Sequence, residues 1–337
     1  MGKAAAKAAA GWKVRAKLPG LAYFVHAIAF SPAGKVLASG VHGTAVWLTD
    51  TAGGKPLHKL DGYETVDNLA FSRDGRMFAA AGGETTNVYD VKTGTQLAAL
   101  DVESNHVSFS PDGRLLAAAT KKSPLVFETK GWTRAAKLDG HKSQVTFVEF
   151  LAGGGLATCA GKEVRVWDVA AGTSTAFDHK GDTNYLCASG DGRYVVSAGY
   201  KRHARVWDVA AKKQVAELSG HEQEVWAAAI SHDGALVVTG SGEGAVRVWR
   251  ARGGELLHEF RSDGEDDAEG APVALSADAK LVAANMPGVR VWETTSGKLV
   301  ADLPANADIS CLAFSPDGKL LAAGSEDAVV IYEVIGS

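Results

Sequence analysis

The residues of this chain that could do chemistry are its histidines, its cysteines and one acidic run. The sequence contains no His-x-His pair, no His-Glu-x-x-His and no Cys-x-x-Cys, the close spacings that present zinc ligands. Cys159, Cys187 and Cys311 lie far apart inside apolar segments, which favours buried free thiols over a disulfide framework. We therefore expect no metal, no cofactor and no catalytic residues, and a reducing, cytoplasmic setting.

Two further segments of the sequence resemble ligand-binding motifs. Residues 240–245 match the dinucleotide-binding fingerprint by letter, but they fall between two expected strands and open no helix, so we interpret them as a turn. The sequence has no Gly-Lys-Ser/Thr phosphate loop and no Gly-x-Ser-x-Gly nucleophile elbow. The acidic run 263–269 lacks the spacing of an EF-hand loop. Its composition favours a solvated loop, and a partner-binding loop or a cation site are the alternatives.

The elements that position these residues repeat along the chain. An aromatic residue ends an alternating, β-branched segment at intervals of 38 to 43 residues, a period typical of four-stranded propeller blades. The eight positions are Trp47, Tyr89, Phe127, Trp167, Trp207, Trp249, Trp292 and Tyr332. No segment shows a sustained helical apolar stripe, so the chain is predicted to be nearly all β.

A turn signal recurs inside each repeat. It reads Ser-Pro-Asp-Gly or a close variant at 31–34, 72–75, 110–113, 189–192, 231–234 and 315–318. Proline or Asp suits the first turn positions and glycine takes the left-handed one, so each copy predicts a tight hairpin. The copies at 151–155 and 276–279 are degenerate, and we expect looser hairpins there.

These residues resemble the WD40-repeat family. The resemblance rests on Gly140-His141 with Trp167-Asp168, on Gly220-His221 with Trp249-Arg250, and on the turns above. It implies an all-β, eight-bladed propeller that serves as a non-catalytic scaffold for a peptide or protein partner. In the family the motif histidine bonds a Ser or Thr, an Asp and the repeat Trp, so His141 and His221 are interpreted as structural. Near His221 the sequence offers Thr239 and Trp249, but Glu243 in place of Asp.

The chain ends predict how the ring closes. The last repeat stops after 331–334 without a fourth strand, and residues 11–20 look like the fourth-strand segment 131–140. We expect residues 12–18 to be the outer strand of the last blade, which removes two exposed edges. The predicted organisation is an Ala/Lys-rich tail at 1–11, one propeller at 12–334 and a C-terminal tail at 335–337.

The family resemblance places partner binding where the innermost strands begin, on the top face of the ring. By register these positions are His26, Asp67, Asn105, Thr146, Asn184, Trp226, Ala271 and Ser310. Trp226 is the expected aromatic anchor, although packing inside a blade would explain it as well. Tyr23, Phe24, Tyr63 and Tyr200 are neighbouring candidates.

The loops of this face divide by charge. The basic half holds Lys121, Lys122, Lys142, Lys162, Lys180, Lys201 and Arg202. The acidic half holds Glu222, Glu224, Glu243, the run 263–269, Asp308, Glu326 and Asp327. Such a face would orient a charged partner, with Lys201 and Arg202 taking part. Plain solvated loops are the alternative.

Two other functions compete with the scaffold. One is a propeller enzyme with a site in the central channel. The other is a nucleic-acid binder that uses the basic half, which the net charge of -4 disfavours. No run approaches the roughly 18 apolar residues that cross a bilayer, so no membrane partner is expected. The sequence leaves the partner unnamed and allows either a monomer or a subunit of a larger assembly.

Overall fold

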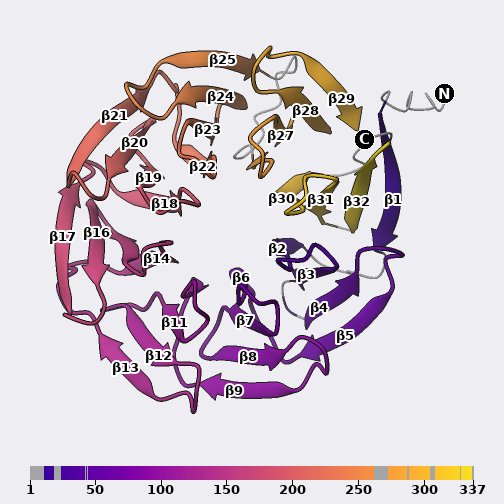
Figure 1. Cartoon of the computed structure of the whole chain (residues 1–337). Helices are drawn as coiled ribbons and strands as arrows, with labels where there is room; N and C mark the ends of the chain where they lie inside the picture. Colours follow the sequence, from indigo (N-terminus) through magenta and orange to yellow (C-terminus); the bar gives the residue numbers. More distant parts are fainter. Residues whose placement is uncertain are drawn as a thin grey trace.

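A computed structural model describes residues 11–18, 24–41, 43, 45–261, 272–286, 288–303, 308–326 and 328–335. Over these ranges the secondary structure is all β, and strands β1 to β32 form eight four-stranded antiparallel sheets. The sheets stand as blades around a central axis and form a ring (Figure 1). The predicted eight-bladed β-propeller is confirmed.

The two inner strands of each blade are short and largely apolar because neighbouring blades cover both of their faces. The innermost strands are β2 (Val25–Phe30), β6 (Asn68–Phe71), β10 (Val107–Phe109), β14 (Val145–Phe150), β18 (Thr183–Ala188), β22 (Val225–Ile230), β26 (Val273–Leu275) and β30 (Ile309–Phe314). The second strands are β3 (Val36–Val41), β7 (Met77–Ala81), β11 (Leu115–Ala118), β15 (Leu156–Ala160), β19 (Tyr194–Gly199), β23 (Leu236–Ser241), β27 (Leu281–Asn285) and β31 (Leu320–Ser325).

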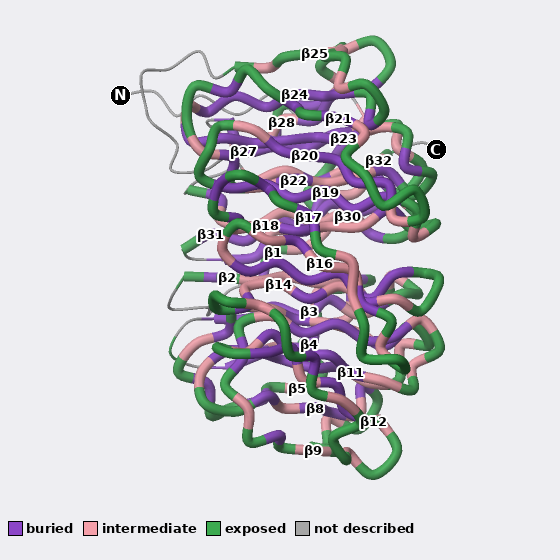
Figure 2. Tube along the Cα trace, turned by 90° about the vertical axis from the view of Figure 1, so that its left-hand side faces the viewer, coloured by how far each residue is buried: buried purple, intermediate pink, exposed green. Residues whose placement is uncertain are grey.

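The third strands are still largely buried, and the outermost strands are the most exposed of the four. The third strands are β4 (Ala45–Asp50), β8 (Thr86–Asp90), β12 (Leu125–Glu128), β16 (Glu163–Asp168), β20 (His203–Asp208), β24 (Ala245–Arg250), β28 (Val289–Glu293) and β32 (Val329–Val334). The outermost are β1 (Trp12–Leu18), β5 (Pro56–Asp61), β9 (Gln96–Leu100), β13 (Arg134–Lys137), β17 (Thr173–Asp178), β21 (Lys213–Ser219), β25 (Leu256–Arg261) and β29 (Leu299–Leu303). Burial follows the strands, and the loops on the two faces of the ring are exposed (Figure 2).

The Ser-x-Asp-Gly turns form the predicted tight hairpins. In the second blade the Ser72 hydroxyl donates to Asp74 Oδ1 at 2.7 Å and accepts the Met77 N–H at 2.9 Å. Gly75 takes the left-handed φ of 70° that the turn requires. The same serine–aspartate bond recurs in the turns at Ser110, Ser189, Ser231 and Ser315.

Only one of the two degenerate turns is altered. The looser hairpin expected at 276–279 is wrong, because Ser276 still donates to Asp278 at 2.8 Å and Ala279 adopts the left-handed φ of 58°. The turn at 151–155 does differ. It is closed by a bond from the Leu151 N–H to the Gly155 carbonyl, one residue shorter than in the other blades, and it has no serine–aspartate pair.

The repeat aromatic of the first blade was assigned to the wrong residue. Trp249 lies opposite Val237, the sixth residue after its turn serine, and the residue opposite the equivalent Leu37 is Thr49. Trp47 is therefore two residues out of register. It still packs toward the preceding blade, because residues two apart in a strand share a face.

The ring closes as the sequence predicts. Strand β1 pairs antiparallel with β32, from Trp12 opposite Val334 to Leu18 opposite Val329. Arg15 forms an ion pair with Glu333 at 2.5 Å across this junction. The two ends of the chain thus share one blade with β30 and β31 (Figure 1).

Candidate functional site

The candidate site is the mouth of the central channel, which we define as the eight predicted mouth positions, one at or just before the start of each innermost strand. Two hollows open there. The wide hollow has a volume of about 870 Å³, and the narrow hollow has a volume of about 610 Å³. The wide hollow brings together His26, Trp226 and Ser310, and the narrow hollow brings together Asp67, Asn105, Thr146 and Asn184. Ala271, the eighth predicted position, lies outside the described residues.

The residue that follows each mouth position decides how wide the mouth is. In three consecutive blades this residue carries a ring, and the neighbouring rings meet in tilted contacts around the channel. His106 lies 4.4 Å from Phe147, and Phe147 lies 5.1 Å from Tyr185, measured between ring centroids. On the other side the equivalent residues are small, such as Ala27 and Ala227, and the wide hollow occupies that space. Sequence reasoning missed this asymmetry, although the residues follow directly after the predicted mouth positions.

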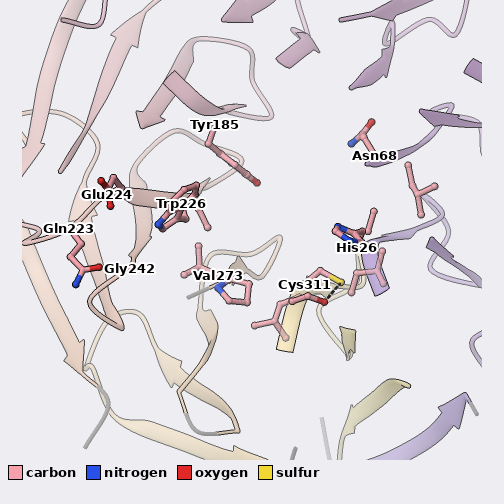
Figure 3. A pocket seen from close by; sticks show the side chains of 16 residues that line it. His26, Asn68, Tyr185, Gln223, Glu224, Trp226, Gly242, Val273 and Cys311 are labelled. Atoms are coloured by element: carbon pink, nitrogen blue, oxygen red, sulfur yellow. Dashed lines mark hydrogen bonds between the residues drawn. The ribbon is translucent and has the colours of Figure 1, made fainter. Parts of the chain in front are cut away.

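Trp226 is not packed inside a blade. Its side chain is 42% exposed, and it meets Tyr200, which is 50% exposed, in a T-shaped contact with centroids 5.6 Å apart. Because Trp226 lines the wide hollow and Tyr200 the narrow one, this pair forms the ridge between the two hollows. Figure 3 shows Trp226 and His26 on opposite sides of the wide hollow.

The other aromatic candidates differ in how far they are exposed. Phe24 is 36% exposed, and its ring lies 5.2 Å from that of His26. Tyr63 is buried and donates a hydrogen bond to the Tyr89 hydroxyl at 2.9 Å, so its candidacy as a surface contact is wrong. Tyr23 lies outside the described residues.

Lys201 and Arg202 lie in the loop after β19, directly beside Tyr200. Lys201 packs so closely over Gly181 that a side chain at Gly181 would overlap it. Lys180 and Arg202 both adopt a left-handed φ, of 61° and 62°, which few residues with side chains tolerate. We call Lys180, Lys201 and Arg202 the basic rim. None of the three forms an ion pair with another described residue.

The expected division into a basic and an acidic half is only partly present. Lys121 is neutralised by Glu103 at 2.8 Å, and Glu222 by Arg261 at 3.3 Å. Glu243 is a buried structural residue, since its carboxylate is 2.8 Å from His221 Nδ1. The acidic run 263–269 and Asp327 lie outside the described residues. The halves therefore carry fewer free charges than the sequence suggested.

The structural interpretation of His221 is confirmed. The Trp249 indole N–H donates to Thr239 Oγ1 at 2.8 Å, and the same hydroxyl lies 2.7 Å from His221 Nε2. Burial lowers the pKa of His221, so it is neutral at pH 7 and its single N–H faces Glu243. Burial alone would raise the pKa of Glu243, but hydrogen bonds from Ser241, His221 and the Glu222 backbone outweigh it and lower the pKa to about 2.

The fourth and fifth blades contain the same network. In the fourth, Thr158 binds both Trp167 at 2.9 Å and His141 at 2.7 Å. In the fifth, Ser197 joins Trp207 and His179, each at 2.8 Å. The histidine of the fifth blade was missed because Asp178, not glycine, precedes it.

Among the described residues no three His, Cys, Asp or Glu side chains gather closely enough to hold a metal ion. None of the described segments is a helix long and apolar enough to span a membrane.

The fold and the mouth define a closed β-propeller with two hollows and an exposed aromatic pair at its channel entrance. A family model for the WD domain, G-beta repeat, matches residues 54–90, 132–168, 173–208, 212–250 and 297–332. These segments make up more than half of the sequence. The chain belongs to the WD40-repeat family, as its motifs indicated.

Curated relatives cover parts of the chain. A guanine nucleotide-binding protein subunit beta from Arabidopsis thaliana is 32% identical over 194 residues, 51% of this chain and 51% of the relative. Autophagy-related protein 16 from the same plant is 27% identical, over 50% of this chain and 34% of the relative. Small ribosomal subunit protein RACK1y from Oryza sativa subsp. japonica is 27% identical, over 42% and 44%. The chain thus spans about half or less of the length of these relatives.

Proposed function

We propose that this protein is a non-catalytic interaction scaffold that binds an extended segment of a protein partner across the mouth of its channel. The observation that carries the proposal is the exposed pair of Tyr200 and Trp226 on the ridge between two hollows. Aromatic side chains beside a recess are the usual anchors of protein interfaces. A segment that crosses the mouth would contact both rings and place side chains in both hollows.

The chemistry of the mouth supports binding over catalysis. The thiol in the wide hollow belongs to Cys311, and burial raises its pKa to about 12, so it is not a thiolate nucleophile at neutral pH. His106 in the narrow hollow has its pKa lowered to about 4 by burial, which makes it a poor general base.

The relatives support a role in assemblies. One is named as the beta subunit of a guanine nucleotide-binding protein and another as a protein of the small ribosomal subunit. We propose that this protein likewise works bound to other proteins, in a cytoplasmic setting. Its contact residues would be Trp226, His26, Asp67, Asn105, Thr146, Asn184, Ser310, Lys201 and Arg202.

Affinity capture from a native lysate, read by mass spectrometry, tests the proposal. The variant combines Trp226→Ala with Arg202→Glu on the mouth. The matched control combines Leu97→Ala, whose side chain is 43% exposed on β9, with Arg114→Glu in a hairpin turn at the other end of a blade. We expect a partner that is lost with the mouth variant and kept with the control. Partners kept by both variants would move binding away from the mouth.

A further inference from the structure

The charge inside the mouth is opposite to the charge beside it. The described lining of the two hollows includes the carboxylates of Asp67, Asp182 and Glu224 and contains no lysine or arginine. The basic rim of Lys180, Lys201 and Arg202 lies next to the narrow hollow, where Tyr200 and Asp182 link it to the lining. A ligand that matches this pattern is positive at its centre and negative at one side.

Glu224 is the carboxylate best placed to meet such a ligand. It is half-buried in the wide hollow two residues before Trp226, and it forms no ion pair with any other described residue. Its neighbour Glu222 is exposed and is already paired with Arg261 at 3.3 Å. The contrast matters because a half-buried carboxylate is less screened by solvent, and so it gains more from an incoming cation than an exposed, paired one does.

Trp226 supplies the second half of the same subsite. Trp226 is 42% exposed and lines the same hollow as Glu224, and the edge-on contact with Tyr200 fixes the orientation of its indole. The face of an indole attracts a lysine or arginine cation more strongly than the other aromatic rings do. An indole and a carboxylate on one wall therefore favour a basic side chain over an apolar one.

We propose that the mouth binds a lysine or arginine side chain of the partner, between Trp226 and Glu224, and that acidic residues flanking it meet the basic rim. This inference rests on the proposed function, since it names the chemistry of the segment that crosses the mouth. An acidic segment that entered the hollows themselves would meet carboxylates of its own sign and no lysine or arginine of the described lining. An acidic residue outside the hollows, toward Lys201 and Arg202, would meet opposite charge.

A peptide-display selection against the full chain tests the inference. Random peptides are selected on the wild type and rescreened on the Trp226→Ala variant, and the selected peptide is then synthesised for fluorescence anisotropy. We expect one shared lysine or arginine position with acidic neighbours. Replacing that arginine by citrulline, which keeps its shape and removes its charge, should weaken binding at least about tenfold.

The protein side of the test uses two neighbouring glutamates. Glu224→Gln should weaken binding of the arginine peptide by about fivefold or more, whereas Glu222→Gln should change it less than about twofold. The comparison of the arginine peptide with the citrulline peptide is made on the unaltered protein. Its result therefore does not depend on the folding of any variant.

The outcomes separate the two proposals. Peptides that are lost on Trp226→Ala but share an apolar or acidic anchor would overturn the basic subsite and leave the scaffold role standing. Peptides that bind the Trp226→Ala variant as tightly as the wild type would overturn both the basic subsite and the binding of a partner segment at the mouth. The same holds if no peptide is enriched over an albumin control.

Discussion

The indole of Trp12 packs edge-on against the ring of Phe314, with centroids 6.5 Å apart, and so joins the first strand to the innermost strand of the last blade. Trp12 is 4% exposed, and its cluster also includes Leu303 and Tyr332. The ring is therefore held shut by a buried core as well as by the backbone ladder between β1 and β32.

Truncation should reveal this closure. Deleting residues 1–19 removes β1 and leaves β32 with an open edge, so we expect a sharp fall in melting temperature, while deleting 1–10 should leave it unchanged. Trp12→Ala should cost about 3 to 5 kcal/mol by emptying the core at the junction. Thermal and urea unfolding would measure both. Equal stability of the two truncations would argue against the closure described here.

The Trp–Thr–His network should be costly to break. Thr239→Val removes the hydroxyl that binds both Trp249 and His221, which leaves two buried polar groups unpaired. We expect a loss of about 2 to 4 kcal/mol in urea unfolding. Thr49→Val is the matched control. Thr49 lies on β4 of the first blade and is also buried, but its hydroxyl makes no hydrogen bond to another described residue, so this change should cost less than about 1 kcal/mol.

Stability should fall as pH drops from 7 to 5. Burial lowers the pKa of His106 and His141 to about 4 and that of His179 to about 3, whereas in the unfolded chain each lies near 6.5. Below pH 6.5 the unfolded chain takes up protons that the folded state does not, at about 1.4 kcal/mol per pH unit for each histidine. Melting curves between pH 7 and pH 5 test the sign of this pH dependence. His106→Phe, which keeps the ring beside Phe147, should make the dependence shallower, and a flat profile in the wild type would contradict the assignment.

Glu149 should have the opposite pH dependence. It lies half-buried on β14, and desolvation raises its pKa from 4.5 to about 7. The stabilising contribution of its proton is complete below pH 4.5 and is lost as pH rises through 7. Glu149→Gln should therefore be more stable than the wild type at pH 8, by at most about 3 kcal/mol, and nearly equal to it at pH 5. If the variant is no more stable than the wild type at pH 8, water solvates the Glu149 carboxylate, and burial does not raise its pKa.

The sequence by itself determined the blades. Each hairpin turn and each strand depends on a few neighbouring residues, such as Ser72, Asp74 and Gly75, so the same local chemistry can be read in every repeat. The closing strand could also be predicted, because residues 12–18 repeat the pattern of a fourth strand. The register assigned to Trp47 was wrong because it relied on local alternation alone. Alternation does not distinguish two positions on one face of a strand.

Only the tertiary structure decided what the mouth contains. The contact of Tyr200 with Trp226, the pairing of Lys121 with Glu103 and the burial of Glu243 each join residues from separate strands or loops. The sequence placed His26, Asp67 and the other mouth positions on one rim. It did not indicate which of these residues share a hollow. That depends on how far side chains from different blades reach across the channel, a distance that is set by the closure of the whole ring and by no single repeat.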